Sequence, residues 1–208
     1  GYASLELSTP MPENAIFDIG SVTKQFTAAA ILKLVEDKKL SLDDDFTKYL
    51  EFDTKGRKIT ISQLLDHTSG LAQTKGKEEF IQLENDEFPY KLMVRLVEPK
   101  DFLFEPGEAL IYNNTAFVFL GLIIEKVTGQ SYEDYLKETF FDPLGLHNTS
   151  YSSSTKVIKN KVNGYRYAPN GLQQIGYLNY GIPYSAGSLS NTTEDILIWM
   201  RALHTGKV

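Results

Sequence analysis

The spacing of apolar residues changes abruptly near Ser21, and this change is the strongest constraint on the fold. Residues 3–7 alternate and residues 16–19 are mostly apolar, so both segments predict short strands, with two prolines between them. From residue 21 to about residue 37, apolar side chains recur at three- and four-residue intervals, which predicts a helix with Ser21 as N-cap. Ser21 is therefore expected at a strand-to-helix junction.

Further helices are expected downstream, with short extended segments between some of them. The helical patterns cover residues 61–66, 88–97, 114–128 and 193–204, and another helix starts near Ser131. Gly129 is expected to end the strongly apolar helix at residues 114–128. Residues 150–180 are rich in Tyr, Asn, Gly and Ser and predict loops and short strands. This mixture is typical of an α+β protein.

The composition excludes several classes of function. The 208 residues are enough for one domain or two small ones, and the net charge of −6 argues against a nucleic-acid-binding surface. The absence of cysteine excludes thiolate catalysis, disulfides and cysteine-ligated metal. The three histidines lack the spacing of a catalytic zinc site, and Asp43-Asp44-Asp45 lacks that of a calcium loop. We therefore expect no metal and no cofactor.

Ser21 and Lys24 stand three positions apart, which places both side chains on one face of a helix. A serine hydroxyl is a weak nucleophile until a base removes its proton, and a helix N-terminus favours negative charge nearby. A lysine can be that base if burial lowers its pKa, and the small and apolar residues after Lys24 suit burial. Taken alone, the pair is more often a capping serine with a surface lysine.

Tyr112-Asn113-Asn114 follows a Pro-Gly turn and comes just before the apolar helix. A phenol near a lysine offers a shared proton: either Lys24 is neutral and Tyr112 protonated, or Lys24 is charged and Tyr112 is a phenolate. Asn114 can both donate and accept a hydrogen bond, which suits the binding of an amide or ester carbonyl. The alternative is a buried tyrosine followed by an asparagine that only caps the helix.

Five motifs follow one another in order and together cover nearly the whole chain. They are Ser21-x-x-Lys24, then Leu64-Leu65-Asp66-His67-Thr68-Ser69-Gly70-Leu71, then Pro106-Gly107 ahead of Tyr112-x-Asn114, then Pro143-Leu144-Gly145-Leu146, then Ser185-Ala186-Gly187. The ordered set resembles the penicillin-recognising, serine β-lactamase-like family, in its class C branch of β-lactamases, D-Ala-D-Ala carboxypeptidases, D-aminopeptidases and esterases. The resemblance implies an α+β, β-lactamase/transpeptidase-like fold.

The resemblance also implies a role for each residue of the site. Ser21 would be the acylated nucleophile, and its backbone N–H would supply half of the oxyanion hole. Lys24 and Tyr112 would share general-base and general-acid work, and Asn114 would help to bind the substrate. The expected function is hydrolysis of a small-molecule or peptide amide, ester or β-lactam, as in β-lactamases, carboxypeptidases and esterases. The rival is a non-catalytic protein of the same fold that binds peptidoglycan fragments or related ligands.

The family also has a third motif, Lys-Thr-Gly or a His-x-Gly variant, which is not found after Tyr112. We therefore expect a single partial domain over residues 1–208, truncated at both ends, with a sheet remnant at 1–20, a mainly helical region at 21–208 and the C-terminal sheet segment absent. Such a chain would be weakly active or inactive. Its strand edges would favour self-association or pairing with the missing C-terminal segment.

The sequence shows neither a signal peptide nor the apolar run of about 20 residues that spans a bilayer. We therefore expect no membrane span in this chain. The family resemblance implies an extracytoplasmic location in a bacterium, periplasmic or secreted.

Overall fold

Helix α5 (Asn114–Thr128) runs through the core of the computed structural model, which describes residues 1–73, 97–98, 100–153, 156–175 and 180–208. Ten consecutive residues of α5, Thr115 to Ile124, are buried, because they are apolar or small on every side of the helix. The Asn113 side chain caps its first turn, and Gly129 ends it with a left-handed φ of 73°. The helix predicted over residues 114–128 is confirmed.

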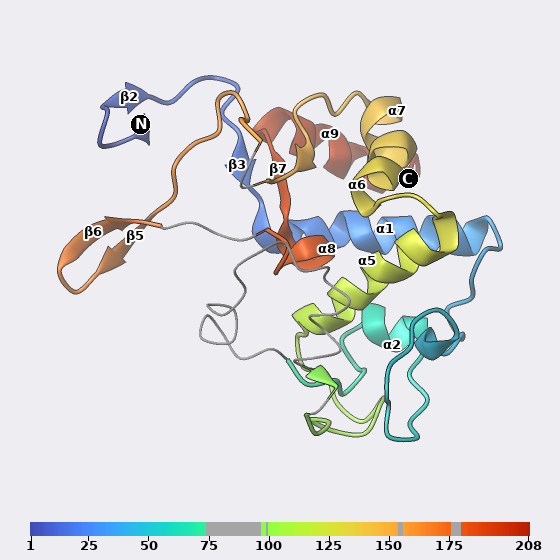
Figure 1. The fold of residues 1–208 in the computed structure, drawn as a ribbon. Coiled ribbons are helices and arrows are strands. Elements are labelled where there is room, and N and C mark those ends of the chain that lie inside the picture. The colour runs from blue at the N-terminus through green and yellow to red at the C-terminus, as the bar shows by residue number, and fades with distance from the viewer. Residues whose placement is uncertain (74–96, 99, 154–155, 176–179) are drawn as a thin grey trace.

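Helices α1 (Thr23–Glu36) and α9 (Thr193–His204) pack together on the core through aromatic rings. The Phe26 ring of α1 stacks on the Trp199 ring of α9, with 3.9 Å between their centroids and 17° between their planes. The Phe141 ring meets Phe26 edge-on at 5.9 Å. Figure 1 shows α1 crossing α5 near the middle of the molecule. The predicted bounds of the last helix, residues 193–204, are confirmed.

The other helices of the described residues are short. They are η1 (Gly20–Val22), η2 (Phe46–Lys48), α2 (Ile61–Leu65), α6 (Tyr132–Leu136), η3 (Lys137–Phe141), α7 (Asp142–Leu144) and α8 (Tyr184–Gly187). The helices predicted at residues 61–66 and after Ser131 are both present, and the Ser131 side chain caps α6. Within the described ranges, no helix has the length and apolar character needed to cross a membrane.

The strands form small antiparallel sheets in the part of the chain that the structure describes. They are β1 (Tyr2–Ser4) with β2 (Thr9–Pro10), β3 (Phe17–Asp18) with β7 (Leu189–Asn191) and β4 (Ser150–Tyr151), and β5 (Tyr165–Ala168) with β6 (Gly171–Gln174). Phe17 pairs with Asn191 and Ser150 pairs with Ser190, so β7 is central. This sheet holds the segment just before Ser21 beside the segment just after α8. The β5–β6 hairpin lies apart from the helices (Figure 1).

Two of the sequence predictions need correction and one cannot be compared. Residues 3–7 do not form one strand, because β1 ends at Ser4 and the Ser8 N–H closes a turn onto the Leu5 carbonyl. Ser21 is not an N-cap: it lies inside η1, whose N-cap is Ile19 with no side-chain bond, so the 3-10 turn displaces the cap. The helix predicted at residues 88–97 falls mainly on residues 88–96, outside the described ranges.

Candidate active site

Ser21 and Lys24 lie where β3 passes through the turn η1 into α1. The Lys24 Nζ atom is 3.2 Å from the Ser21 Oγ atom, within hydrogen-bonding distance. Gly20 allows the chain to enter this turn, because its φ of 50° lies in the left-handed region that favours glycine. Ser21 is exposed at the surface while Lys24 points inward, so a nucleophile open to solvent stands over a buried amine.

Lys24 is only 7% exposed, so the reading of Lys24 as a surface lysine is wrong. Besides Ser21, its Nζ atom donates to the Asn114 Oδ1 atom at 2.8 Å and to the Ala186 carbonyl oxygen at 2.7 Å. Three acceptors match the three N–H groups of an ammonium. A neutral amine would keep the bonds to Asn114 and Ala186 and could turn its lone pair toward Ser21 Oγ. The pocket therefore accommodates both protonation states.

Two opposing effects act on the Lys24 amine. Burial lowers the pKa of Lys24 from its ordinary value, and the hydrogen bond and charge of Tyr112 offset part of this shift. The Nζ atom also lies 4.7 Å from the ring centroid of Tyr112 and 5.5 Å from that of Phe117, a placement that favours the cation. The net direction is downward, which makes the neutral amine easier to reach at moderate pH.

Tyr112 completes the contact with Ser21. Its hydroxyl donates to the Ser21 Oγ atom at 2.7 Å, and the residue is 45% exposed, so the alternative of a buried tyrosine is wrong. Asn113, and not Asn114, caps α5, which leaves the exposed Asn114 free to hold Lys24. The structure thus brings the four predicted residues together in one cluster around the Ser21 hydroxyl and the Lys24 amine.

The turn of residues 67–73 holds Tyr112 in place through backbone and side-chain bonds. The His67 carbonyl accepts from the Ile111 N–H at 3.1 Å, and its Nδ1 atom accepts from the Asn113 N–H at 3.2 Å. The Gln73 Nε2 atom donates to the Tyr112 carbonyl at 2.7 Å. The motif around His67 therefore supports the residues on both sides of Tyr112 as well as Tyr112 itself.

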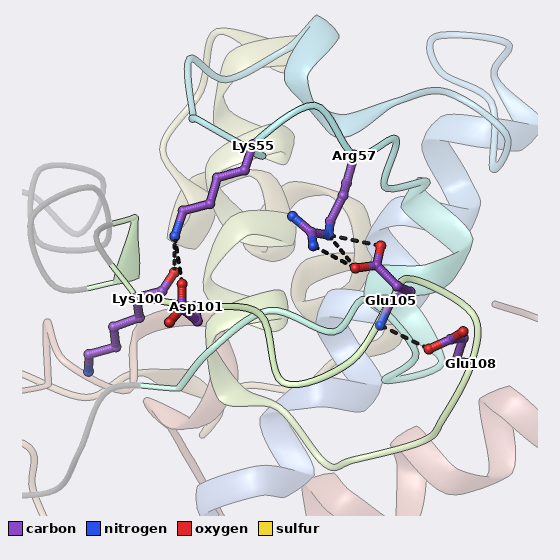
Figure 2. Close-up of polar contacts among 6 residues, drawn as sticks. All are labelled: Lys55, Arg57, Lys100, Asp101, Glu105 and Glu108. Atoms are coloured by element: carbon purple, nitrogen blue, oxygen red, sulfur yellow. Dashed lines mark hydrogen bonds and ion pairs between the residues drawn. The ribbon is translucent and has the colours of Figure 1, made fainter.

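A second set of contacts fixes the loop that leads to Tyr112. Figure 2 shows Lys55 bonded to the Lys100 carbonyl and Asp101, and Arg57 bonded through two of its nitrogens to Glu105. The Lys55 distances are 2.9 and 3.2 Å, and the Arg57 Nε atom is 2.9 Å from Glu105 Oε2. These exposed contacts join residues 55–57 to residues 100–105, and so restrain the chain that leads to Tyr112.

Gly70 lets the loop approach the turn of residues 67–73 closely. The Gly70 carbonyl accepts from the Leu103 N–H at 2.8 Å, and a Cβ at Gly70 would lie 2.1 Å from the Phe104 carbonyl oxygen. Its φ of 70° is also left-handed. A side chain at this position would therefore force the loop before Tyr112 away from the site.

Ala186 is the site residue that the sequence alone did not identify. Its carbonyl reaches Lys24 because α8 packs directly on α5, where a Cβ at Gly121 would lie 2.1 Å from Ser185 Oγ. The buried Ser185 hydroxyl donates to the Phe117 carbonyl at 2.8 Å, which fixes α8 on α5. The Ser185-Ala186-Gly187 motif belongs to the family resemblance, and its small side chains are the sequence signal for this close approach.

A polar network anchors the strand β3 that leads into the Ser21 turn. The Asp18 carboxylate accepts from Ser152 Oγ at 2.6 Å and from Tyr180 OH at 2.8 Å, and it pairs with Lys161 Nζ at 2.8 Å. Lys161 also donates to the Tyr180 hydroxyl at 2.8 Å. Four residues far apart in sequence therefore fix the backbone three positions before the serine.

Asn113→Ala is expected to lower the free energy of unfolding by about 1–2 kcal/mol, because α5 loses its cap. The Asn113 Oδ1 atom accepts from the Ala116 N–H at 3.0 Å, and its Nδ2 atom donates to the Leu71 carbonyl at 2.6 Å. Urea unfolding followed by circular dichroism measures the loss. Ser131→Ala, which removes the exposed cap of α6, is the matched control and should cost less. An unchanged stability of Asn113→Ala would contradict the assignment of this cap.

Similar proteins share this arrangement of elements. A penicillin-binding protein of Bacillus subtilis (strain 168) is 31% identical over 221 residues, which cover 98% of this chain and 48% of that protein. The crystal structure of a penicillin-binding protein from Bacillus halodurans matches with a TM-score of 0.84 at 29% identity, over 99% of this chain and 65% of that one. The D-amino acid amidase of Ochrobactrum anthropi SV3, complexed with L-phenylalanine amide, matches with a TM-score of 0.88 at 27% identity. The match covers 100% of this chain and 61% of that one.

These matches establish the fold and show how much of each relative the chain covers. The chain spans between about a third and a half of the length of the first curated relatives it matches. The predicted α+β, β-lactamase/transpeptidase-like fold is confirmed, and the model of the family described as beta-lactamase matches residues 1–208. The relatives include penicillin-binding proteins and an amidase. The chain belongs to the beta-lactamase family.

Proposed function

We propose that this protein is a serine hydrolase that forms an acyl-enzyme at Ser21. One observation carries the proposal: the Ser21 Oγ atom lies within hydrogen-bonding distance of both a buried amine, Lys24 Nζ at 3.2 Å, and a phenol, Tyr112 OH at 2.7 Å. These two neighbours can accept the proton of Ser21 as the serine attacks. They can then donate a proton to the leaving group.

The proposed reaction has two halves. Ser21 Oγ attacks the carbonyl carbon of the substrate, its proton passes to Lys24 Nζ or to the Tyr112 oxygen, and a tetrahedral intermediate forms. The carbonyl then re-forms, the bond to the leaving amine or alcohol breaks, and the pair delivers a proton to that group. A water molecule repeats the sequence on the acyl-enzyme and frees Ser21. Lys24 Nζ and the Tyr112 hydroxyl both contact Ser21 Oγ, so either can exchange the proton with the serine.

The substrate class follows from Asn114 and from the relatives. The Asn114 Oδ1 atom accepts from Lys24, and its Nδ2 group supplies donors at an exposed position beside Ser21, which suits a substrate carbonyl. The backbone N–H of Ser21 is proposed as one oxyanion donor. The structural relatives include a penicillin-binding protein and a D-amino acid amidase, so we propose an amide or β-lactam substrate, with an ester as the alternative substrate.

The test is covalent labelling of Ser21. Incubation with a fluorophosphonate, followed by intact-mass spectrometry, should give a single adduct that is absent in Ser21→Ala and retained in Ser41→Ala, an exposed serine elsewhere. The same comparison with a fluorescent penicillin and with a D-phenylalanine amide then identifies the acyl group. If the wild-type chain binds penicillin reversibly but forms no adduct with the fluorophosphonate or with penicillin, the protein is a ligand-binding member of the family and the proposal fails.

A further inference from the structure

His67 is bonded to the segment that carries Tyr112 through an atom that titrates. Its Nδ1 atom accepts a hydrogen bond from the Asn113 N–H at 3.2 Å. A histidine nitrogen accepts only in the neutral ring, because both nitrogens of the imidazolium are donors. The observed bond therefore requires a neutral His67 with its proton on Nε2, and protonation would place two donors face to face.

The imidazole also supports the ring of Tyr112 directly. The centroids of the His67 and Tyr112 rings are 4.7 Å apart with 43° between their planes, and the His67 ring lies 5.0 Å from the ring of Phe117. The His67 carbonyl accepts from the Ile111 N–H. His67 thus contacts the residue before Tyr112, the phenol ring, and the residue after it. A change at His67 therefore alters the position of the Tyr112 hydroxyl beside Ser21.

The groups around the imidazole favour its neutral form. The titratable side chains that face it are Lys24 from α1, Tyr112 from the adjoining loop, and Asp66, its neighbour in sequence. Burial lowers the pKa of His67 below its ordinary value, and the charge of Lys24 lowers it further, whereas Asp66 and the backbone contact with Asn113 act in the opposite direction and are outweighed. The ring is therefore neutral at neutral pH, and it becomes charged only below the ordinary range of a histidine.

We infer that His67 is a proton-sensitive positioning residue: the neutral imidazole holds the Asn113 amide and so keeps the Tyr112 hydroxyl on Ser21, and protonation releases it. The effect on reaction rate rests on the proposed function, whereas the effect on the Asn113 amide does not. Acid would then silence the site by displacing Tyr112, in addition to any protonation of Lys24.

Nuclear magnetic resonance tests the structural half of the inference without any activity. The amide signal of Asn113 should move with pH in the wild-type protein, with the same midpoint as the imidazole signals of His67 and below about 6.5. In His67→Asn the movement with that midpoint should disappear, because an amide oxygen accepts in place of Nδ1 but does not titrate. In His147→Asn, whose ring is exposed on another surface, the movement should remain.

Labelling rates test the functional half. His67 has a left-handed φ of 65°, which both asparagine and glycine tolerate, so His67→Asn and His67→Gly differ chiefly in the hydrogen-bond acceptor. At pH 7.5, His67→Gly should label about 10- to 10²-fold more slowly, and His67→Asn should recover most of that loss. For the pH of the Asn113 midpoint, each labelling rate is divided by the rate of the same protein at pH 7.5. The wild-type value should then be about half that of His67→Asn, because His67 is protonated in half of the wild-type molecules.

The possible outcomes separate this inference from the proposed function. If the Asn113 signal does not follow the titration of His67, or if His67→Asn keeps the acid step of the wild-type rate, the inference is wrong while the acyl-enzyme proposal stands. If the wild-type chain is not labelled at any pH, the proposed function fails. In that case the Asn113 titration alone decides whether His67 positions Tyr112.

Discussion

Replacing Lys24 with methionine is expected to slow fluorophosphonate labelling of Ser21 by about 10²- to 10⁴-fold, the range for loss of a positioned proton acceptor. Methionine keeps much of the length of the side chain but has no amine to take the proton from Ser21 Oγ, now 3.2 Å away. The Asn114 and Ala186 oxygens also lose their shared donor. The measurement is the rate of adduct formation, followed by intact mass over time.

The same variant is expected to be about as stable as the wild-type protein, although its activity is lost, because the loss of a donor to the Asn114 and Ala186 oxygens opposes the gain from removing a buried cation. Lys24 is buried, and taking a cation out of water costs free energy that an apolar side chain does not incur. Lys33→Met, on the solvent side of the same helix, is the control and should label at the wild-type rate. A Lys24→Met protein that labels normally would remove Lys24 from the mechanism, and one that unfolds would show that the amine mainly supports the structure.

Gly121→Val is expected to lower the free energy of unfolding by about 3 kcal/mol, the upper end for overpacking a core. The added Cβ would lie 2.1 Å from Ser185 Oγ, 2.4 Å from Ser185 Cβ and 2.8 Å from a ring carbon of Tyr184. Because these atoms belong to α8, the helix must move away from α5. The Ala186 carbonyl would then leave Lys24, so labelling should fall together with stability.

Two companion variants make the Gly121 result interpretable. Gly121→Ala should destabilise the protein by less, although alanine is the better helix former by about 1 kcal/mol in an open helix. Adding Ser185→Gly to Gly121→Ala removes the two nearest atoms and should restore part of both stability and labelling. Urea unfolding and labelling rates measure the two effects. A Gly121→Ala protein more stable than wild type would show that α8 does not pack against α5 as described.

The sequence predicts well those features that depend on neighbouring residues. The bounds of α5 and α9 follow from apolar periodicity and local caps, and the Ser21–Lys24 contact follows from a spacing of three on one helix. The N-cap prediction at Ser21 was wrong because Gly20 turns the chain before the helix starts, which inserts a 3-10 turn that periodicity does not reveal.

The features that the sequence did not predict are long-range and made by the backbone. The Ala186 carbonyl has no residue-type signature, since every residue carries one, and only the packing of α8 on α5 selects it. The His67–Asn113 bond joins a side chain to a backbone amide 46 positions away. The three histidines lack the spacing of a metal site, and only the packed rings show what one of them contacts.

The distance in sequence between Lys24 and Ala186 has a consequence for the newly made chain. The two are 162 residues apart, and ribosomes add about 5–20 residues per second, so the lysine is synthesised roughly 8–32 s before the carbonyl that holds it. Throughout that interval the serine and lysine are neighbours on a growing chain with no pocket to bury the amine. Ser21 should therefore remain unreactive during translation, and labelling of stalled ribosome complexes should begin only after Ala186 has left the exit tunnel.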